Sequence, residues 1–483
     1  VKRTFDPAGL MNPGKIVDPP PMDDRSLFRY PPGYTERPLP VVLDWSDSGG
    51  LLGAAERCNN NGACRKYRPD VMCPSFRVTH DERHSTRGRA NALRLALTGQ
   101  LGENGLDSPE MAEAMSLCIS CKGCRRECPA GVDMARMKLE WQHRRNGLRG
   151  VPLREKLLAA VPRLAPRMVS ATRRASVVAP VVNVLARLPG RSLLGLAARR
   201  ALPQWSARPW RDDELHVAGA QPAEGRPDVA LFVDTFSRWF EPEIPRAAAA
   251  LLNASGRQAT VLHAPTGERP LCCGRTYLSA GMLDEAREEA SRLVAAAAPL
   301  VRQGIPVVGL EPSCLYTLVD EVPALLGGED ADMLSELAQM LPTYLQTVSL
   351  DALPAATASG SPASSASSPE SRSILVHGHC HQKAFGGADA TLARLRWVPG
   401  ADVRLIESGC CGMAGAFGYH AEHYETSVAM AESGLAPAVR AASQGATLVA
   451  DGTSCRAQIS DVTGRKAEAS VVVLARKLGL SGG

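Results

Sequence analysis

Four closely spaced cysteines, between residues 118 and 128, constrain this chain more than any other feature. They follow the pattern C-x2-C-x2-C-x3-C, and a proline comes next. Bacterial proteins with two iron–sulfur clusters use this run, and in them the fourth cysteine ligates a different cluster from the first three. Zinc is the alternative, although zinc loops commonly hold two separated cysteine pairs. The run predicts an electron-transfer protein with a second cysteine group elsewhere, and Gly123 is expected to let the loop turn tightly.

A second cysteine group lies upstream, and its spacing differs from the first. Cys58 and Cys64 take the first and third positions of the run, Asn61 stands where the second cysteine belongs, and Cys73 precedes a proline. If the fourth ligands cross between clusters, one complete four-thiolate site results. We expect this main site to hold a 4Fe-4S cluster on Cys73, Cys118, Cys121 and Cys124. The other site, with Cys58, Cys64 and Cys128, leaves three alternatives: a three-iron cluster, a four-iron cluster with Asn61 or solvent as the odd ligand, or an empty remnant.

Arginines lie between the two cysteine groups, in the segment 85–90. The apolar spacing after it is helical, and its Ser and Thr residues suit a helix N-cap. Arginines beside a cluster can donate hydrogen bonds to its sulfides and raise its potential; capping and charge balance are the alternative roles. A second helix is expected to begin at Ser108-Pro109, with proline in its first turn, and to lead into the cysteine run.

The second half of the chain contains an internal repeat of strands and helices. Each copy has a short apolar strand, a second strand, a Cys-Cys-Gly triplet, a helix, a third strand and a Ser-Cys pair. In the first copy we expect strands at 229–234, 259–263 and 306–309 and a helix at 282–297. In the second we expect strands at 374–380, 403–406 and 447–451 and a helix at 426–436. This alternation predicts two parallel sheets, with functional loops at the carboxyl ends of the strands.

Cysteines gather at the strand ends of both copies. Adjacent cysteines followed by glycine direct two sulfurs outward from one turn, and the Ser-Cys loop supplies a third. The second copy has four, and four convergent soft ligands indicate zinc or an iron–sulfur centre. These four are Cys380, Cys410, Cys411 and Cys455. The first copy has only Cys272, Cys273 and Cys314, with the position of Cys380 falling near Ser237, and is expected to bind a metal weakly or not at all.

Two histidines and several glycines accompany the second set. His379 and His381 flank Cys380. They either ligate a metal or relay protons, or they hydrogen-bond their own loop. The glycines of 412–418 are spaced G-x2-G-x2-G, which differs from the dinucleotide-binding pattern G-x-G-x-x-G. We expect them instead to let backbone N–H groups approach cluster sulfur.

Positive charge is concentrated in the middle of the chain. The net charge is +5, yet residues 141–211 hold 15 Lys and Arg against one acid. Such a surface suits an acidic partner or anionic lipid; alternatively, its arginines pair with acidic groups of the same chain. No aromatic-studded basic motif accompanies the charge, so nucleic acid is not an expected partner.

Cysteine usage and apolar segments indicate the compartment. Fourteen cysteines among 483 residues, grouped in ligand-like motifs, fit a reducing cytosol better than a disulfide-bonded secreted protein. The first residues lack the apolar stretch of a signal peptide, and no segment reaches about 18 uninterrupted apolar residues. We therefore expect a cytoplasmic protein, either free or peripheral at the inner membrane.

Several motifs carry a resemblance to known redox families. Segments 377–382 and 408–415 are similar to the cysteine-rich domains of the glycolate oxidase iron–sulfur subunit, of the C subunit of anaerobic glycerol-3-phosphate dehydrogenase and of the B subunit of heterodisulfide reductase. Segment 5–16 resembles the closing segment of FAD-linked oxidases. With 72–75 and 85–90 added, the chain resembles the C-terminal half of fused FAD and iron–sulfur D-2-hydroxyacid dehydrogenases, of the bacterial D-2-hydroxyglutarate or D-lactate type.

The resemblance and the repeat together imply a fold class of α + α/β. An all-helical ferredoxin-like domain is expected first, followed by two repeated α/β cysteine-rich (CCG) domains with parallel sheets. The expected boundaries are 1–40 for the tail of a FAD-linked oxidase domain, 41–140 for the helical domain, 141–225 for a basic helical connector, 226–345 for the first CCG domain, 346–372 for a flexible linker and 373–483 for the second CCG domain.

The resemblance also implies a role in electron transfer. A flavin reduced by a D-2-hydroxyacid (2-hydroxyglutarate, lactate or glycolate) would pass electrons to the main cluster, then toward the second CCG domain, then to a quinone or another acceptor. FAD would lie in a preceding domain or a partner, so this chain would be a fragment or one part of an oligomer. The alternatives are a thiol–disulfide reductase, similar to the B subunit of heterodisulfide reductase, and a zinc-stabilised interaction scaffold.

Overall fold

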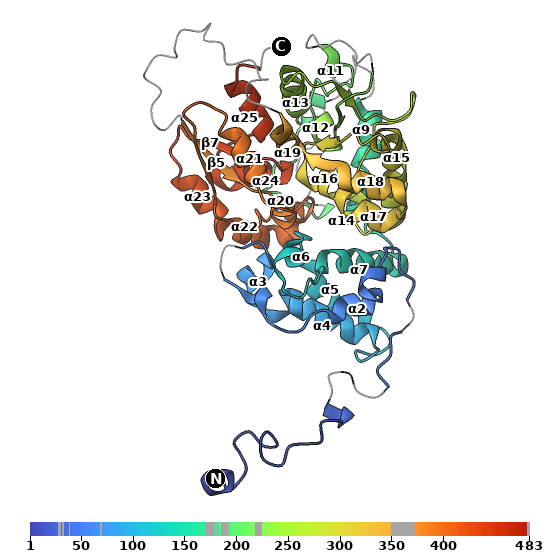
Figure 1. Ribbon diagram of the computed structural model, residues 1–483, viewed down its shortest axis with the longest axis vertical. Coiled ribbons are helices and arrows are strands. Elements are labelled where there is room, and N and C mark those ends of the chain that lie inside the picture. The colour runs from blue at the N-terminus through green and yellow to red at the C-terminus, as the bar shows by residue number, and fades with distance from the viewer. Residues whose placement is uncertain are drawn as a thin grey trace.

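The computed structural model describes residues 1–27, 30, 33–37, 39–67, 70–169, 179–180, 182–184, 192, 194–217, 225–348 and 372–480. Figure 1 shows a layer of helices (blue to cyan) beneath two α/β units, the first green to yellow and the second orange to red. The predicted linker 346–372 lies almost entirely outside the described residues. The mixture of a helical part and parallel sheets agrees with the expected fold class.

Two helices of the helical part begin at the N-cap residues that the sequence provides. Ser85 accepts a hydrogen bond from the Gly88 N–H at 2.9 Å, and Ser108 accepts one from the Met111 N–H at 3.1 Å. Both are N-caps that satisfy an otherwise unpaired backbone donor, so the expected helix starts are confirmed. The helices of this part are α2 (Gly50–Glu56), α3 (Pro74–Thr79), α4 (Thr86–Leu97), α5 (Pro109–Ser116), α6 (Gly123–Glu127) and α7 (Met134–Arg149), with the short turn η3 (Ala63–Arg65).

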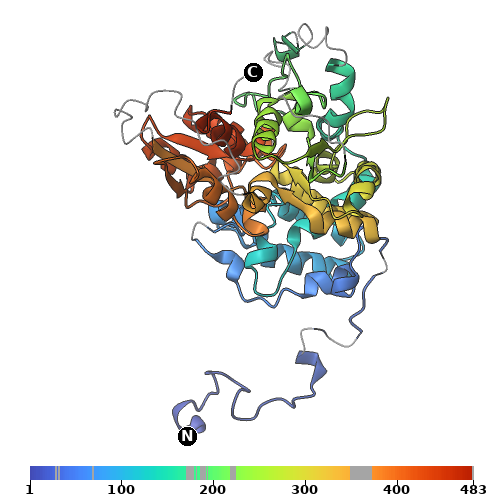
Figure 2. The ribbon, with the colours of Figure 1, turned by 45° about the horizontal axis from the view of Figure 1, so that its top comes forward.

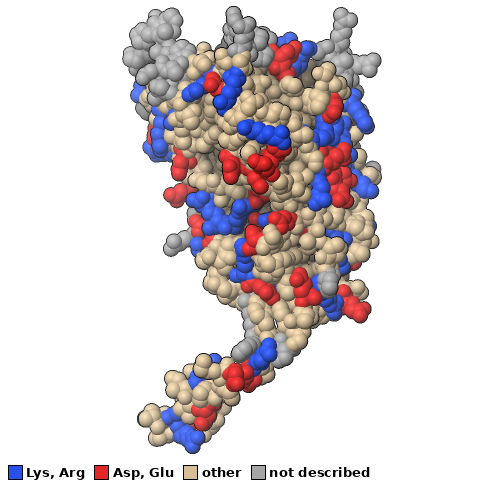
Figure 3. All heavy atoms as spheres, turned by 45° about the vertical axis from the view of Figure 1, so that its right-hand side comes forward, with Lys and Arg blue, Asp and Glu red and all other residues tan. Residues whose placement is uncertain are grey.

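The connector after α7 has short helices, α8 (Leu153–Ala159), α9 (Val161–Val169) and α11 (Glu214–Val217). Its arginines form ion pairs with carboxylates elsewhere in the chain, including Arg163 with Glu288 at 2.6 Å and Arg200 with Asp461 at 3.1 Å. Figure 3 shows basic and acidic side chains intermixed over the face that it displays. No helix among the described residues is long and apolar enough to cross a membrane.

The first α/β unit holds a four-stranded parallel sheet in the order β2-β1-β3-β4. Its strands are β1 (Val229–Phe232), β2 (Ala259–Val261), β3 (Val307–Gly309) and β4 (Ala338–Met340). Alternate residues of β1 pack into different cores, because successive side chains of a strand point to opposite faces. The covering helices are α12 (Thr235–Trp239), α13 (Glu243–Ala254), α14 (Arg275–Ser279), α15 (Leu283–Val301), α16 (Pro312–Val319), α17 (Glu321–Leu326), α18 (Glu329–Leu337) and α19 (Leu341–Tyr344).

The second α/β unit holds a three-stranded parallel sheet in the order β6-β5-β7. An isolated parallel bridge between Val449 and Glu468 takes the place that β4 has in the first unit. The predicted helix 426–436 is broken at Gly434, whose φ of 179° is extended backbone. The strands are β5 (Ser373–His377), β6 (Asp402–Leu405) and β7 (Thr447–Ala450), and the helices are α20 (Cys380–Ala384), α21 (Asp389–Leu395), α22 (Tyr424–Glu432), α23 (Leu435–Ala441), α24 (Thr453–Thr463) and α25 (Ser470–Lys477).

Strand register aligns the two units residue by residue. Phe232 pairs with Gly309 in the first sheet, and His377 pairs with Ala450 in the second. Since Gly309 and Ala450 each lie five residues before the Ser-Cys cysteine, Phe232 and His377 occupy the same position of the fold. The internal repeat is therefore present in the structure.

The three parts share their cores. Tyr277 and Val322 of the first unit belong to one buried cluster with the helical part, and Leu474 of α25 packs with α13 of the first unit. The turned view in Figure 2 shows both α/β units against the helical layer, while the N-terminal segment extends away from it. That segment, with α1 (Lys2–Phe5), leaves large apolar side chains exposed, among them Phe5, Leu10, Ile16 and Met22.

Candidate metal centres

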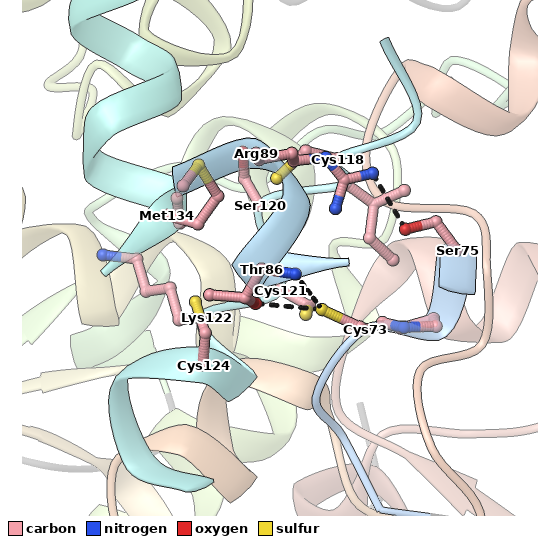
Figure 4. Close-up of a pocket in the computed structure, with 13 residues that line it drawn as sticks. Cys73, Ser75, Thr86, Arg89, Cys118, Ser120, Cys121, Lys122, Cys124 and Met134 are labelled. Carbon is pink, nitrogen blue, oxygen red and sulfur yellow. Dashed lines mark hydrogen bonds between the residues drawn. The ribbon is translucent and has the colours of Figure 1, made fainter. Parts of the chain in front are cut away.

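The four cysteines predicted for the main cluster line one pocket. Cys73 comes from the residue before α3, and Cys118, Cys121 and Cys124 come from the loop that leads into α6. Figure 4 shows their sulfur atoms around the pocket, with Thr86 of α4 directed at Cys73. The structure thus brings residue 73 to the trio, as the crossed-ligand hypothesis requires. Four soft sulfur donors facing one space are a donor set that suits an iron–sulfur cluster or zinc.

Backbone amides point at these sulfurs. The Thr86 N–H donates to Cys73 Sγ at 3.0 Å, and the Thr86 hydroxyl lies 2.9 Å from the same sulfur. Burial raises the pKa of the Cys124 thiol to about 12, although N–H groups of Met134 and Ala135 oppose the shift. Thiols in this setting become thiolates when a metal replaces the proton, so the pocket fits a cluster that its cysteines bind in ionised form.

The tight turn of the loop 118–124 does not depend on the backbone freedom of Gly123, contrary to what the sequence had suggested. Ser120 (φ 51°) and Lys122 (φ 59°) adopt the left-handed conformation, whereas Gly123 does not. A Cβ at Gly123 would lie 2.8 Å from the Met72 nitrogen. The glycine is needed because the backbone of 71–72 packs directly on it. Glu127 fixes that contact by accepting the N–H groups of Val71 and Met72, both at 2.8 Å.

Three cations lie close to the pocket cysteines: Arg89 and Lys122 are buried and line the pocket, and Lys138 is half-buried. Arg89 donates to the Ala114 carbonyl at 2.6 Å and to Ser75 Oγ at 3.0 Å. Its charge lowers the pKa of Cys73, against the larger raising effects of the Cys64 hydrogen bond and burial. Lys138 donates to the Cys118 carbonyl, and burial lowers its pKa. Of the arginines in 85–90, Arg89 therefore lies where it can influence a cluster.

The incomplete second set lies beside the first. A hydrogen bond with Cys73 lowers the pKa of Cys64, and the Arg87 N–H donates to Cys64 Sγ at 3.4 Å. Cys58 and Cys64 are buried in the same core, and Cys128 packs against it. Asn61 is exposed, and its side-chain oxygen accepts the Ala63 N–H at 2.8 Å. Asn61 is therefore engaged in a local turn.

The second α/β unit brings its four predicted cysteines together. Hydrogen bonds run from Cys380 to Cys410, from Cys410 to Cys411 and from Cys411 to Cys455, and burial helps to raise the pKa of each thiol. The Gly412 N–H lies 3.4 Å from Cys410 Sγ, as expected for the glycine segment, whereas the Gly415 N–H donates to Ser454 Oγ.

A histidine that sequence reasoning passed over joins this set. The ligand atoms of His377, Cys411 and Cys455 lie within 4.8 Å of one another. Ser408 Oγ shares a hydrogen bond of 2.9 Å with His377 Nδ1, while Nε2 is buried without a partner among the described residues. One signal was present in the sequence, because His377 ends the strand whose loop carries Cys380.

The two histidines that flank Cys380 have structural contacts. His379 is the N-cap of α20, and its Nδ1 accepts the His381 N–H at 3.1 Å. His381 Nε2 shares a hydrogen bond of 3.1 Å with the Ser120 carbonyl in the main cysteine loop. His379 therefore hydrogen-bonds its own loop, which was one of the two predicted roles. His381 instead joins the second unit to the helical part.

The first unit keeps only part of the cysteine set. Hydrogen bonds run from Cys272 to Cys273 and from Cys273 to Cys314, which repeats the order seen in the second unit. By strand register and by its place as the first residue of α12, Thr235 is the counterpart of Cys380, two residues before Ser237, near which the sequence placed this position. Phe232 replaces His377. The predicted loss of the fourth sulfur is present in the structure.

Each α/β unit contacts the main loop differently. Cys121 packs in one buried cluster with the four cysteines of the second unit. The first unit instead offers carboxylates: Lys122, fully buried, pairs with Asp320 and with Glu321, the latter at 2.6 Å. Arg125 also pairs with Asp320. The loop thus lies between a thiol-rich surface and an ionic one.

Comparison with known proteins adds a family context. Residues 54–132 match the model of a 4Fe-4S dicluster domain. The chain is 30% identical to the C subunit of anaerobic glycerol-3-phosphate dehydrogenase of Escherichia coli K12 over 315 residues, covering 62% of this chain and 72% of that protein. It is also 27% identical to the D-2-hydroxyglutarate dehydrogenases of E. coli K12 and Pseudomonas putida, each over 96% of this chain and 47% of that protein. The chain therefore spans about half the length of these dehydrogenases. No solved structure matches it.

Proposed function

This chain belongs to the family that includes the C subunit of anaerobic glycerol-3-phosphate dehydrogenase, and we propose that it is the electron-transfer part of a FAD-linked D-2-hydroxyacid dehydrogenase. Its relatives and its 4Fe-4S domain support an oxidoreductase role with an iron–sulfur cofactor. The finer assignment draws on the D-2-hydroxyglutarate dehydrogenases that match along 96% of the chain.

One observation carries the proposal: Cys121 borders both cysteine-rich sites. It lines the main pocket and is buried against the cysteines of the second unit. Cys73, Cys118, Cys121 and Cys124 would hold a 4Fe-4S cluster, which supplies one-electron transfer when bound. The protein's residues set its environment: Thr86 donates to Cys73, Arg89 adds charge, and the His381–Ser120 hydrogen bond fixes the second unit against the loop.

The same ligand chemistry applies to the second unit. Cys380, Cys410, Cys411 and Cys455, with His377 beside them, would hold an iron–sulfur centre or zinc. A thiol–disulfide reductase needs an accessible thiol with a lowered pKa. Here Cys410 and Cys411 are each 3% exposed, and their pKa values are raised. Metal binding therefore suits this site better than thiol catalysis.

The electron donor that we propose is a flavin outside this chain, in a preceding domain or a partner protein. Exposed apolar side chains in the segment 1–27 offer a surface for such a neighbour. Translation of the coding DNA upstream of Val1 in the same frame tests the first alternative, and copurification of a flavoprotein tests the second. The acceptor that we propose is a quinone or another carrier.

The cluster assignment is tested with matched serine variants of anaerobically purified protein. Cys121→Ser should lower the iron content by about four atoms per chain and remove the main EPR signal. Cys314→Ser, at another buried thiol that belongs to the incomplete first set, should leave both unchanged. Equal iron content in Cys121→Ser and the unaltered protein would overturn the assignment, and zinc without iron or sulfide would favour a scaffold.

A further inference from the structure

We propose that His420, His423, Glu422 and Glu155 form a Zn²⁺ site where the connector meets the second α/β unit. The ligand atoms of His420, Glu422 and His423 lie within 4.8 Å of one another. Glu155 Oε1 of α8 lies 3.2 Å from His420 Nε2. This site contains no cysteine, and it goes beyond the electron-transfer function without depending on it.

Backbone hydrogen bonds bring its two segments together. The Ala197 N–H donates to the Tyr419 carbonyl at 2.7 Å, and the Ala421 N–H donates to the Gly195 carbonyl at 2.9 Å. These bonds pin the loop with His420 to the connector, which also carries Glu155. The site is therefore built by main-chain pairing and does not depend on long side chains meeting by chance at the surface.

One of the two imidazoles has an unsatisfied nitrogen. His420 is 7% exposed and its Nε2 faces Glu155 Oε1 at 3.2 Å, while His423 Nδ1 is buried without a hydrogen-bond partner among the described residues. The His423 ring stacks on the Phe417 ring, with the two ring centroids 4.3 Å apart, and this contact limits rotation of the His423 ring. Buried polar atoms nearly always have partners, so orphaned ones in a native protein point to an ion or a water. An orphaned imidazole nitrogen beside a second imidazole and two carboxylates favours a metal ion.

The donor set and its spacing suit zinc. Zinc binds imidazole nitrogen and carboxylate oxygen at about 2.0–2.2 Å, which in a tetrahedral site places neighbouring donors about 3.4 Å apart. Glu155 and His420 lie near that separation, and the ligand atoms of His420, Glu422 and His423 lie within 4.8 Å of one another. The Glu422 side chain is 51% exposed, so the site is open to solvent on one side.

One arginine competes with a metal for a carboxylate of this site. The cations that face the group are Arg154 and Lys138. Arg154 Nη2 lies 2.6 Å from Glu422 Oε1 and so competes with a metal for that carboxylate. Removing Arg154 should therefore strengthen zinc binding, whereas removing a ligand should weaken it.

The test uses the full chain with its iron–sulfur centres intact, titrated with Zn²⁺ and followed by calorimetry and by zinc content after gel filtration. His420→Gln/His423→Gln should bind one zinc fewer per chain than the unaltered protein. His263→Gln, an exposed histidine of the first unit, should bind the same amount as the unaltered protein. Unchanged zinc content and affinity in the double variant would overturn the site, and thermal unfolding verifies that the variants fold.

Two further variants separate a metal site from a plain ion-pair cluster. Arg154→Gln should tighten zinc binding about tenfold because it frees Glu422, whereas Glu422→Gln should weaken binding about tenfold because a ligand is lost. Weaker or unchanged zinc binding in Arg154→Gln, or unchanged binding in Glu422→Gln, would contradict the assigned ligand set.

Discussion

The two α/β units share a fold and differ at the end of one strand. In both units the two thiols of the Cys-Cys-Gly turn are hydrogen-bonded to each other, and the second is hydrogen-bonded to the cysteine of the Ser-Cys pair. These thiols are Cys272, Cys273 and Cys314 in the first unit and Cys410, Cys411 and Cys455 in the second. His377 and Cys380 in the second unit are replaced by Phe232 and Thr235 in the first. The turn and its buried thiols can be retained as core packing, while metal binding, as we propose it for the second unit, would depend on the residues at the end of β5 and the start of α20.

The units also differ in what they present to the main cysteine loop. The second unit places its cysteines and His381 against Cys121 and Ser120. The first unit places Asp320 and Glu321 against Lys122. We infer that the first unit anchors the loop, whereas the second takes part in its redox chemistry. Four predictions test this contrast, beginning with the most pronounced.

Removing the equivalent thiol from each unit should lower metal binding in the second unit only. Cys411→Ser should abolish metal binding by the second unit, because Cys411 lies in the centre of its ligand set. Cys273→Ser should leave metal content at the level of the unaltered protein, since the first unit lacks the fourth sulfur. Iron and zinc analysis per chain measures both, and equal losses in the two variants would show that both units bind metal.

The anchoring role predicts a large loss of stability when a buried charge is removed. Asp320→Asn leaves Lys122 and Arg125 with less compensation and should lower the free energy of unfolding by about 3–5 kcal/mol. Asp213→Asn makes the same chemical change in the exposed Arg211–Asp213 pair and should cost less than about 1 kcal/mol. Denaturant unfolding of both variants measures the difference, and comparable losses would argue against a buried anchor.

The glycine of each Cys-Cys-Gly turn should respond to its own surroundings. Gly412 has φ of 87°, and an added Cβ would lie 2.3 Å from the Ser427 carbonyl oxygen, whereas at Gly274 (φ 80°) the closest atom lies at 3.0 Å. Gly274→Ala should cost about 1–2 kcal/mol for the left-handed backbone alone. Gly412→Ala should add about 1–3 kcal/mol for overpacking. Thermal or denaturant unfolding measures the loss of stability in each variant. A larger loss in Gly274→Ala than in Gly412→Ala would contradict this ranking.

Acid should weaken the anchor without affecting it at neutral pH. Burial alone would raise the pKa of Asp320, but the charges of Lys122 and Arg125 outweigh it and hold the pKa at about 2, below the ordinary 3.8. A depressed folded-state pKa stabilises the protein above about pH 4, and this contribution disappears as pH falls toward 2. The stability difference between the unaltered protein and Asp320→Asn should narrow over that range, and a constant difference would contradict the assignment.

Local spacing in the sequence predicted much of the sites. The C-x2-C-x2-C run and Cys73-Pro correctly indicated which sulfurs would share a pocket, because backbone geometry restricts how such a loop folds. The order of strands and Cys-Cys-Gly turns likewise predicted two parallel sheets. Thr235 was missed because spacing along the sequence is less reliable than strand register, and the loop from β2 to Cys272 is longer than its counterpart before Cys410.

Contacts between distant segments could not be predicted in this way. Lys122 and Asp320 lie 198 residues apart, and neither position carries a motif that names its partner. His377 was passed over in favour of His379 and His381 because adjacency to Cys380 in sequence was taken as adjacency in space. A strand end and a helix N-cap point side chains in different directions, which only the fold reveals.

The burial of Cys121 between the helical part and the second unit bears on how the protein matures. Synthesis from the N-terminus completes the loop of 118–124 well before residues 380–455 emerge from the ribosome. Iron and sulfide delivered during that interval would meet an open loop, whereas later delivery would require the second unit to swing away. We therefore expect cofactor insertion to precede final docking, which makes the timing of metal supply a determinant of the yield of active protein.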